Sequence, residues 1–104
     1  MTGGRGIKML QNSRKQYNTP GSFSFEQWSL LVEFYSPNFI CIRCKNQAFI
    51  TPDHIVPVSK LGSNWIENIQ PLCERCNSSK NDKITDCRFD CGEFNNKLKI
   101  LCYD

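Results

Sequence analysis

The chain has 104 residues, enough for one small domain but too few for two. Hydrophobic residues make up 39% of it, which excludes a disordered chain by composition, and no apolar run approaches the roughly 20 residues of a membrane-spanning helix. The formal net charge of +3 does not by itself indicate a nucleic-acid partner. A core of this size is marginal, so we expect a metal site to contribute to its stability.

Residues 1–22 are predicted to form a flexible basic arm. They lack apolar periodicity, and Thr19-Pro20-Gly21-Ser22 is a turn or linker signal. The basic residues of this segment are Arg5, Lys8, Arg14 and Lys15. The arm is expected to lie along nucleic-acid phosphates, and the alternative is a solvated tail. The N-terminus has no apolar signal segment, so we expect an intracellular, cytoplasmic protein.

A helix is predicted to begin near Ser24 and to end before Pro37. Ser24 and Gln27 have the spacing of a capping box, and a proline disfavours helix in the residue before it. Four apolar residues follow at helical spacing and define one face: Trp28, Leu31, Val32 and Tyr35. We expect this face to pack on the rest of the domain, although Trp28 could instead stack on a base.

Between residues 39 and 83 the pattern predicts strand, loop, strand and helix. The expected elements are an extended stretch at 39–42, a strand at 48–51 that resumes at 53–57, a loop at 58–67, a strand at 68–72 and a helix from 73 to about 83. Pro52 lacks a backbone donor, so we expect it at a sheet edge or a bulge. Residues 86–92 are predicted to be irregular, and residues 97–102 to form a terminal strand or a short helix.

Two Cys-x-x-Cys pairs predict a structural zinc site. The expected ligands are Cys41, Cys44, Cys73 and Cys76. Four thiolates fill the coordination shell of zinc, so this ion is closed to substrate and cannot be a catalyst. From the cysteines alone, a zinc ribbon without catalysis is the simplest interpretation. The other three cysteines, Cys87, Cys91 and Cys102, are expected to be buried free thiols.

Asp53-His54, which includes the chain's one histidine, lies between the cysteine pairs and changes this interpretation. Together with Cys41-Ile-Arg-Cys44 and the run from Asn68 to Lys80, it resembles the HNH endonuclease family, of the zinc-stapled type of phages and bacteria. The resemblance covers about residues 24–90. It implies an α+β nuclease domain at 23–104 with its motif core at 41–83. The implied fold is a small ββα-metal (His-Me finger) fold with a four-cysteine zinc site and an N-terminal packing helix.

The resemblance also implies a role for each residue of the motif. Asp53 is expected to bind a catalytic divalent ion, His54 to act as the general base, and Asn68 to hold the loop and orient the histidine. Asn77 stands where the family usually has its last histidine, and it is expected to be the second ligand of the ion. Carboxylate and amide oxygens suit Mg²⁺ or Mn²⁺. Adjacent strand residues face opposite sides, so we expect a distortion at Pro52 to bring Asp53 and His54 to one site.

These expectations define a function and its alternatives. The chain is predicted to be a metal-dependent endonuclease that hydrolyses DNA phosphodiester bonds by nicking, with Lys80 and Lys83 as further phosphate contacts. Lys80 shares a helix face with Asn77, and the alternative for it is a solvated lysine. Other functions left open are a non-catalytic zinc ribbon that binds nucleic acid and a nuclease subunit that depends on a phage or host protein partner. RNA as the substrate, and a monomer or a homodimer, also remain open, and no membrane partner is expected.

Overall fold

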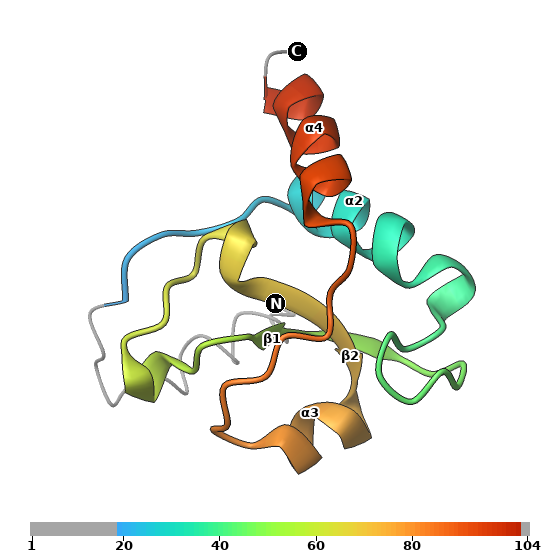
Figure 1. Cartoon of the computed structure of the whole chain (residues 1–104), viewed down its shortest axis with the longest axis vertical. Coiled ribbons are helices and arrows are strands. Elements are labelled where there is room, and N and C mark those ends of the chain that lie inside the picture. The colour runs from blue at the N-terminus through green and yellow to red at the C-terminus, as the bar shows by residue number, and fades with distance from the viewer. Residues whose placement is uncertain (1–18, 103–104) are drawn as a thin grey trace, which may run out of the picture.

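The computed structural model describes residues 19–102, so the four basic residues predicted to contact nucleic acid from the N-terminal arm lie outside the described residues. The regular elements are α2 (Phe25–Tyr35), β1 (Ile50–His54), β2 (Ile69–Cys73), α3 (Glu74–Lys80) and α4 (Cys91–Cys102) (Figure 1). Short 3₁₀ turns occur at Pro37–Phe39, Val58–Lys60 and Ile66–Asn68. The predicted α+β class and the order strand, loop, strand, helix are confirmed.

Helix α2 begins as its capping sequence predicts. The Ser24 Oγ accepts a hydrogen bond from the Gln27 backbone N–H at 3.0 Å, and the Gln27 Oε1 accepts one from the Ser24 N–H at 2.9 Å. The helix ends at Tyr35, two residues before Pro37. Leu31 and Tyr35 are buried, and the other two residues of the predicted apolar face pack against the core.

Strands β1 and β2 form an antiparallel hairpin without a bulge. Its register runs from Ile50 opposite Cys73 to His54 opposite Ile69, with Pro52 opposite Pro71. Ile55 N donates to Asn68 O at 2.8 Å, so these two residues form a hydrogen-bonded pair of the ladder. Hydrogen-bonded and non-hydrogen-bonded pairs alternate along antiparallel strands. Pro52 lies an odd number of residues from Ile55, so the proline pair occupies a non-hydrogen-bonded position. Two prolines therefore fit without loss of a ladder bond.

The prediction of a distortion at Pro52 is wrong, because the pairing register continues through this residue. Asp53 and His54 consequently face opposite sides of a regular strand. Since β1 belongs to a two-stranded sheet, Pro52 does lie in an edge strand, as expected.

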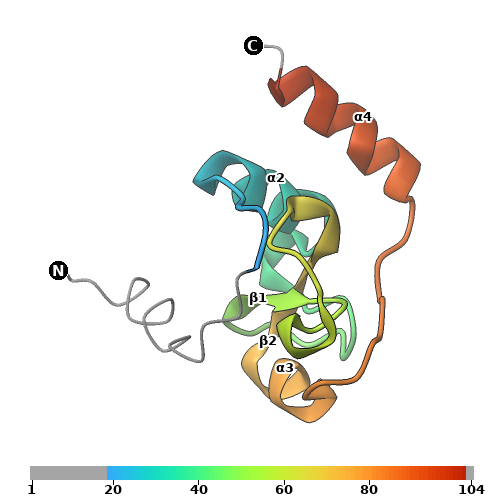
Figure 2. The same ribbon diagram turned by 90° about the vertical axis from the view of Figure 1, so that its left-hand side faces the viewer.

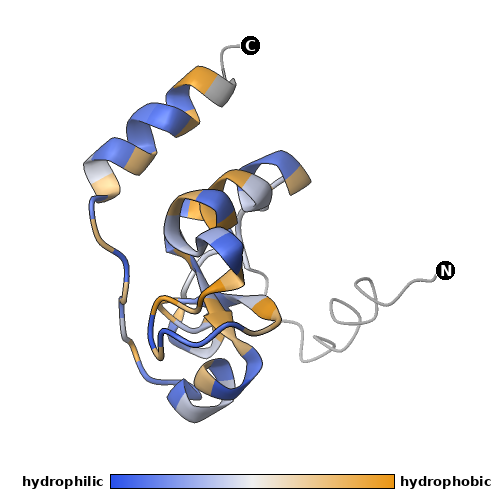
Figure 3. Ribbon diagram, turned by 90° about the vertical axis from the view of Figure 1, so that its right-hand side faces the viewer, coloured by the Kyte–Doolittle hydropathy of each residue, from blue (hydrophilic) through white to orange (hydrophobic). Residues whose placement is uncertain are grey.

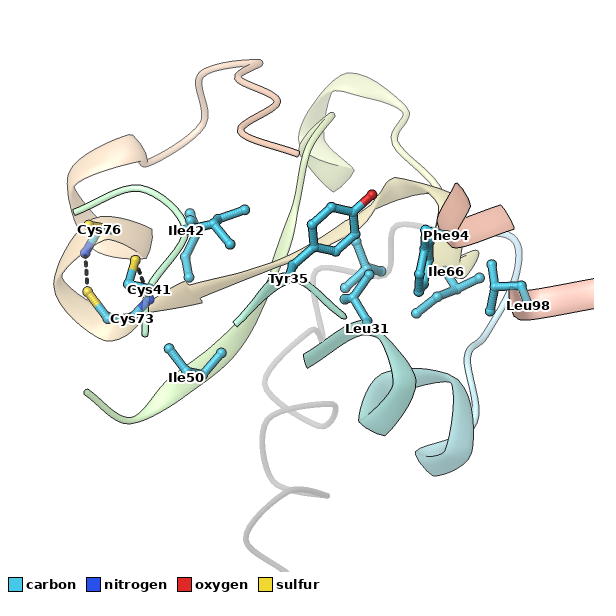
Figure 4. Packing of buried hydrophobic residues seen from close by; sticks show 12 residues of the cluster. Leu31, Tyr35, Cys41, Ile42, Ile50, Ile66, Cys73, Cys76, Phe94 and Leu98 are labelled. Carbon is cyan, nitrogen blue, oxygen red and sulfur yellow. Dashed lines mark hydrogen bonds between the residues drawn. The ribbon is translucent and has the colours of Figure 1, made fainter. Parts of the chain in front are cut away.

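The hydrophobic core joins the helices to the hairpin. Figure 4 shows Leu31 and Tyr35 of α2 beside Ile66, Phe94 and Leu98, with the cysteines at the other end of the same cluster. The C-terminal segment is a helix rather than a strand, and it begins at Cys91, so the irregular stretch ends at residue 90. Figures 1 and 2 show α4 next to α2 and at the opposite end of the molecule from α3. Polar residues alternate with apolar ones around α4 (Figure 3).

Two boundaries differ from the predictions. Residues 19–22 were expected to belong to a flexible arm, but Asn64 N donates to Pro20 O at 2.8 Å. A Cβ on Gly21 would lie 2.6 Å from the Trp65 ring, so the chain here packs closely on the loop. Helix α3 ends at Lys80 rather than near residue 83, because Asn81 leaves the helical region with φ 56° and ψ −127°. Among the described residues, no helix combines the length and apolar character needed to cross a membrane.

Candidate functional site

The four predicted zinc ligands converge on one point. The Sγ atoms of Cys41, Cys44, Cys73 and Cys76 all lie within 4.8 Å of one another. The Cys44 and Cys73 sulfurs are 3.8 Å apart, and a tetrahedral site with Zn–S bonds of about 2.3 Å has sulfur–sulfur edges of about 3.8 Å. None of the four is in a disulfide. The cluster therefore fits a zinc ion with four thiolate ligands.

A backbone hydrogen bond and burial shift the pKa values of two of these thiols, Cys44 and Cys76, in opposite directions. Cys73 is the N-cap of α3, and its Sγ accepts the Cys76 N–H at 3.4 Å, while its own N–H donates to the Cys41 Sγ at 3.3 Å (Figure 4). A backbone hydrogen bond from Asn46 is the main cause that lowers the pKa of Cys44 to about 6. Burial raises the pKa of Cys76 to about 12. A zinc ion would have to displace the Cys76 proton, so zinc binding and proton release are coupled.

A second polar cluster lies at the other end of β1. The Asp53 side chain is 5% exposed, and its Oδ2 accepts a hydrogen bond from Gln70 Nε2 at 2.8 Å. The Lys80 ammonium lies 3.4 Å from the same Oδ2 and donates to the His54 carbonyl at 2.9 Å. Lys80 is 3% exposed. This corrects the prediction that Lys80 contacts phosphate, because its charge is buried and already paired.

Asn77 and Lys80, one turn apart on α3, hold the edge of β1. Asn77 Nδ2 donates to Thr51 Oγ1 at 3.0 Å and to the Pro52 carbonyl at 3.3 Å. Pro52 and His54 are two residues apart, so their carbonyls point to the same edge, where Asn77 and Lys80 satisfy them. Thr51 and Asp53 share one face of the strand. Asn77 therefore contacts the face that carries the Asp53 carboxylate.

Two side-chain oxygen atoms of this cluster have no hydrogen-bond partner among the described residues. Within residues 19–102, neither Asp53 Oδ1 nor Asn77 Oδ1 accepts a hydrogen bond, since their bonds involve Oδ2 and Nδ2. Both are hard oxygen donors of the kind that Mg²⁺ and Mn²⁺ prefer. The donor set therefore fits a hard divalent ion.

Asn68 closes the loop between the strands. Its Oδ1 accepts the Val56 N–H at 2.9 Å, and its Nδ2 donates to the Val56 carbonyl at 3.0 Å and to the Ser63 carbonyl at 2.8 Å. One side chain thus satisfies three backbone groups and fixes both sides of the loop. This loop carries Asn64, whose Oδ1 lies 2.7 Å from His54 Nε2.

The contact with Asn64 determines which nitrogen of His54 is basic. An amide oxygen accepts but cannot donate, so the ring proton belongs on Nε2. Nδ1 is then the nitrogen with the free lone pair. The imidazole is half-buried and is held on the side of β1 opposite Asp53.

The family model for HNH endonucleases matches residues 41–83. The chain contains an HNH endonuclease domain. The matched segment spans both cysteine pairs, the hairpin, its loop and α3, and this family has the ββα-metal fold. Searches of curated proteins and of solved structures gave no significant match. The HNH domain indicates a nuclease acting on nucleic acid.

Three polar residues of the HNH domain contact the predicted site but were not predicted from the sequence. Asn64 holds the imidazole, Thr51 accepts from Asn77, and Gln70 connects Asp53 to the Thr85 carbonyl. Gln70 is fully buried and also accepts the Cys87 N–H at 2.8 Å. A buried glutamine inside a strand is a signal that a polar partner lies nearby, but it does not identify that partner.

The remaining predicted residues lie at the end of the matched segment or after it. Lys83 is exposed after the end of α3, where a phosphate could reach it. Cys87 and Cys91 are free thiols but are only partly buried, which corrects the expectation of full burial. Cys91 Sγ accepts a hydrogen bond from the Tyr35 hydroxyl at 3.6 Å. The side chain of Cys102 lies outside the described residues.

Replacement of Asn68 by alanine is expected to destabilise the HNH domain by about 2–4 kcal/mol, because three hydrogen bonds to backbone groups are lost. Chemical denaturation would measure this change. Asn96→Ala, on the exposed surface of α4, is the matched control and should stay close to wild type. An unchanged midpoint in Asn68→Ala would show that the loop is held by other contacts.

Proposed function

We propose that the HNH domain is a metal-dependent endonuclease that hydrolyses phosphodiester bonds in DNA. The observation that carries this proposal is the arrangement around the end of β1. His54 is oriented through Nε2 and follows Asp53 in β1, on the opposite face of the strand, while Asp53 and Asn77 each have an oxygen that makes no hydrogen bond within the described residues. This combination supplies a base and a cation site within one hairpin and helix.

His54 is proposed as the general base. A neutral imidazole with Nδ1 free can take a proton from water, while the bond from Nε2 to Asn64 keeps the ring in one orientation. Asn68 acts on His54 indirectly, because it fixes the loop that presents Asn64. Each of these residues therefore contributes either the proton transfer or the geometry that it requires.

Asp53 and Asn77 are proposed to hold the catalytic ion, Mg²⁺ or Mn²⁺. When bound, such an ion would stabilise the charge that develops on the scissile phosphate and the leaving oxygen. Thr51 orients Asn77 so that its amide nitrogen faces the strand and its amide oxygen stays available. The cysteine site at the other end of β1 is proposed to hold zinc in a purely structural role.

The substrate contacts are proposed to come from Lys83 and from the basic arm with Arg5, Lys8, Arg14 and Lys15. These residues would bind phosphates without reading sequence. Since the HNH domain has one proposed site per chain, cleavage of one strand is the expected elementary event. Cleavage of both strands would need a dimer or two successive visits.

The test is the conversion of supercoiled plasmid by zinc-loaded protein with Mg²⁺, with Mn²⁺ or with no added divalent ion. We expect open-circular DNA with either metal and none without added ion, because a hard ion is needed at Asp53 and Asn77. Gel electrophoresis over time gives the rate, and His54→Ala is run beside the wild type. Full activity with zinc or nickel alone would contradict the proposed ligand chemistry.

One observation favours a second candidate, a zinc module that binds nucleic acid without cleaving it. Lys80 already neutralises the Asp53 carboxylate at 3.4 Å. If this pairing excludes every cation, the folded protein should bind DNA without cutting it in any metal. A binding titration on protein that fails to cleave would identify this case.

A further inference from the structure

The buried pair of Lys80 and Asp53 places a positive charge at the proposed cation site. Both side chains are almost fully enclosed, at 3% and 5% exposure. The ammonium is fixed at two points, 3.4 Å from the Asp53 Oδ2 and 2.9 Å from the His54 carbonyl oxygen. The Lys80 charge is therefore part of the site and not a solvated charge on the helix surface.

This charge bears directly on divalent-ion binding. Asp53 is the carboxylate of this cluster within the described residues, and Lys80 balances its charge. A divalent ion bound through Oδ1 would lie close to an ammonium that contacts Oδ2 of the same group, and like charges at this range repel in a buried setting. The other proposed ligand, Asn77, is neutral and supplies no compensating charge.

Lys80 also contacts both Asp53 and His54. It holds the carboxylate of Asp53 and the backbone carbonyl of His54 from one helix position. This contact holds the end of β1 against α3. Lys80 is thus a positioning residue that has an electrostatic effect on the site.

We propose that Lys80 keeps the divalent-ion affinity of the free domain low, so that the ion binds tightly only when the phosphodiester of a nucleic acid adds negative charge. The inference rests on the proposed function, because it requires an ion at Asp53 and Asn77. It assigns to Lys80 a coupling between substrate binding and metal loading. The domain would hold little divalent ion when it is free, and it would acquire the ion when it binds DNA.

The test is a titration of Mn²⁺ into the zinc-loaded full chain. The electron paramagnetic resonance signal of free Mn²⁺ measures how much of the ion is bound. Lys80→Gln removes the charge but keeps a hydrogen-bond donor, and it should bind Mn²⁺ at least about tenfold more tightly than wild type. A short phosphorothioate duplex that resists cleavage should tighten Mn²⁺ binding to the wild type by at least about tenfold, and much less to the variant. Lys97→Met, an exposed charge removal on α4, should match the wild type in both titrations.

Equal Mn²⁺ affinity in wild type and Lys80→Gln would overturn the inference. If Asp53→Asn then abolishes that binding, the proposed metal site survives although the role of Lys80 does not. Absence of Mn²⁺ binding in both proteins, with and without DNA, would overturn the metal site as well. Should Lys80→Gln fail to fold, the wild-type titrations decide, since tight binding without DNA and no gain with it contradicts the proposal.

Discussion

His54→Ala is expected to lower the rate of DNA cleavage by about 100- to 10,000-fold, the usual contribution of a general base. The substitution removes Nδ1, the proposed proton acceptor, and leaves the His54 backbone carbonyl in place for Lys80. The ring is half-buried and its side-chain hydrogen bond goes to Asn64, so the hairpin should persist. Single-turnover plasmid nicking measures the rate, and circular dichroism with zinc analysis verifies the fold.

Asn64→Ala separates orientation from chemistry. It keeps the imidazole and removes the atom that fixes the tautomer, so cleavage should fall by less than in His54→Ala. The same rate in His54→Ala and wild type would place the base elsewhere or reveal a contaminating nuclease. A rate in Asn64→Ala as low as that of His54→Ala would mean that the tautomer matters as much as the base.

Removal of zinc is expected to abolish cooperative folding. A structural four-thiolate site can contribute on the order of 10 kcal/mol, and the net stability of a domain is roughly 5–15 kcal/mol. The cluster links the turn after α2 to the hairpin and to the start of α3, so its loss separates elements that share one core. Thermal unfolding followed by circular dichroism, before and after chelation, should show a transition that disappears and returns with added zinc.

Cys44→Ser gives the same prediction by mutation, because serine does not replace a thiolate on zinc. Cys91→Ser is the matched control, since Cys91 lies outside the cluster and a hydroxyl can still accept from Tyr35. Protons compete with zinc for the sulfurs, so zinc should be retained at neutral pH and released as the pH falls. A zinc-free protein that keeps the same transition temperature would refute the structural role of the site.

Local sequence signals determined several parts of this protein. The capping pair Ser24 and Gln27 begins α2 because both bonds form within one turn. The Cys-x-x-Cys spacing suffices to bring two thiols together, since a tight turn or a helix start has that reach. The order of the hairpin, its loop and α3 followed from prolines, turn residues and apolar runs, and the family match covers this stretch.

Only the tertiary structure decided which distant residues of the site contact one another. Lys80 meets Asp53 across 26 intervening residues, and no local pattern distinguishes a helix lysine that is solvated from one that is buried in an ion pair. Asn64 reaches His54 because Asn68 closes the loop that carries Asn64. Pro52 keeps a regular strand because the register sets it opposite Pro71 at a non-hydrogen-bonded position. Hydrogen bonds and charges between distant residues depend on which surfaces the core brings together, and the spacing of residues along the chain does not encode that contact.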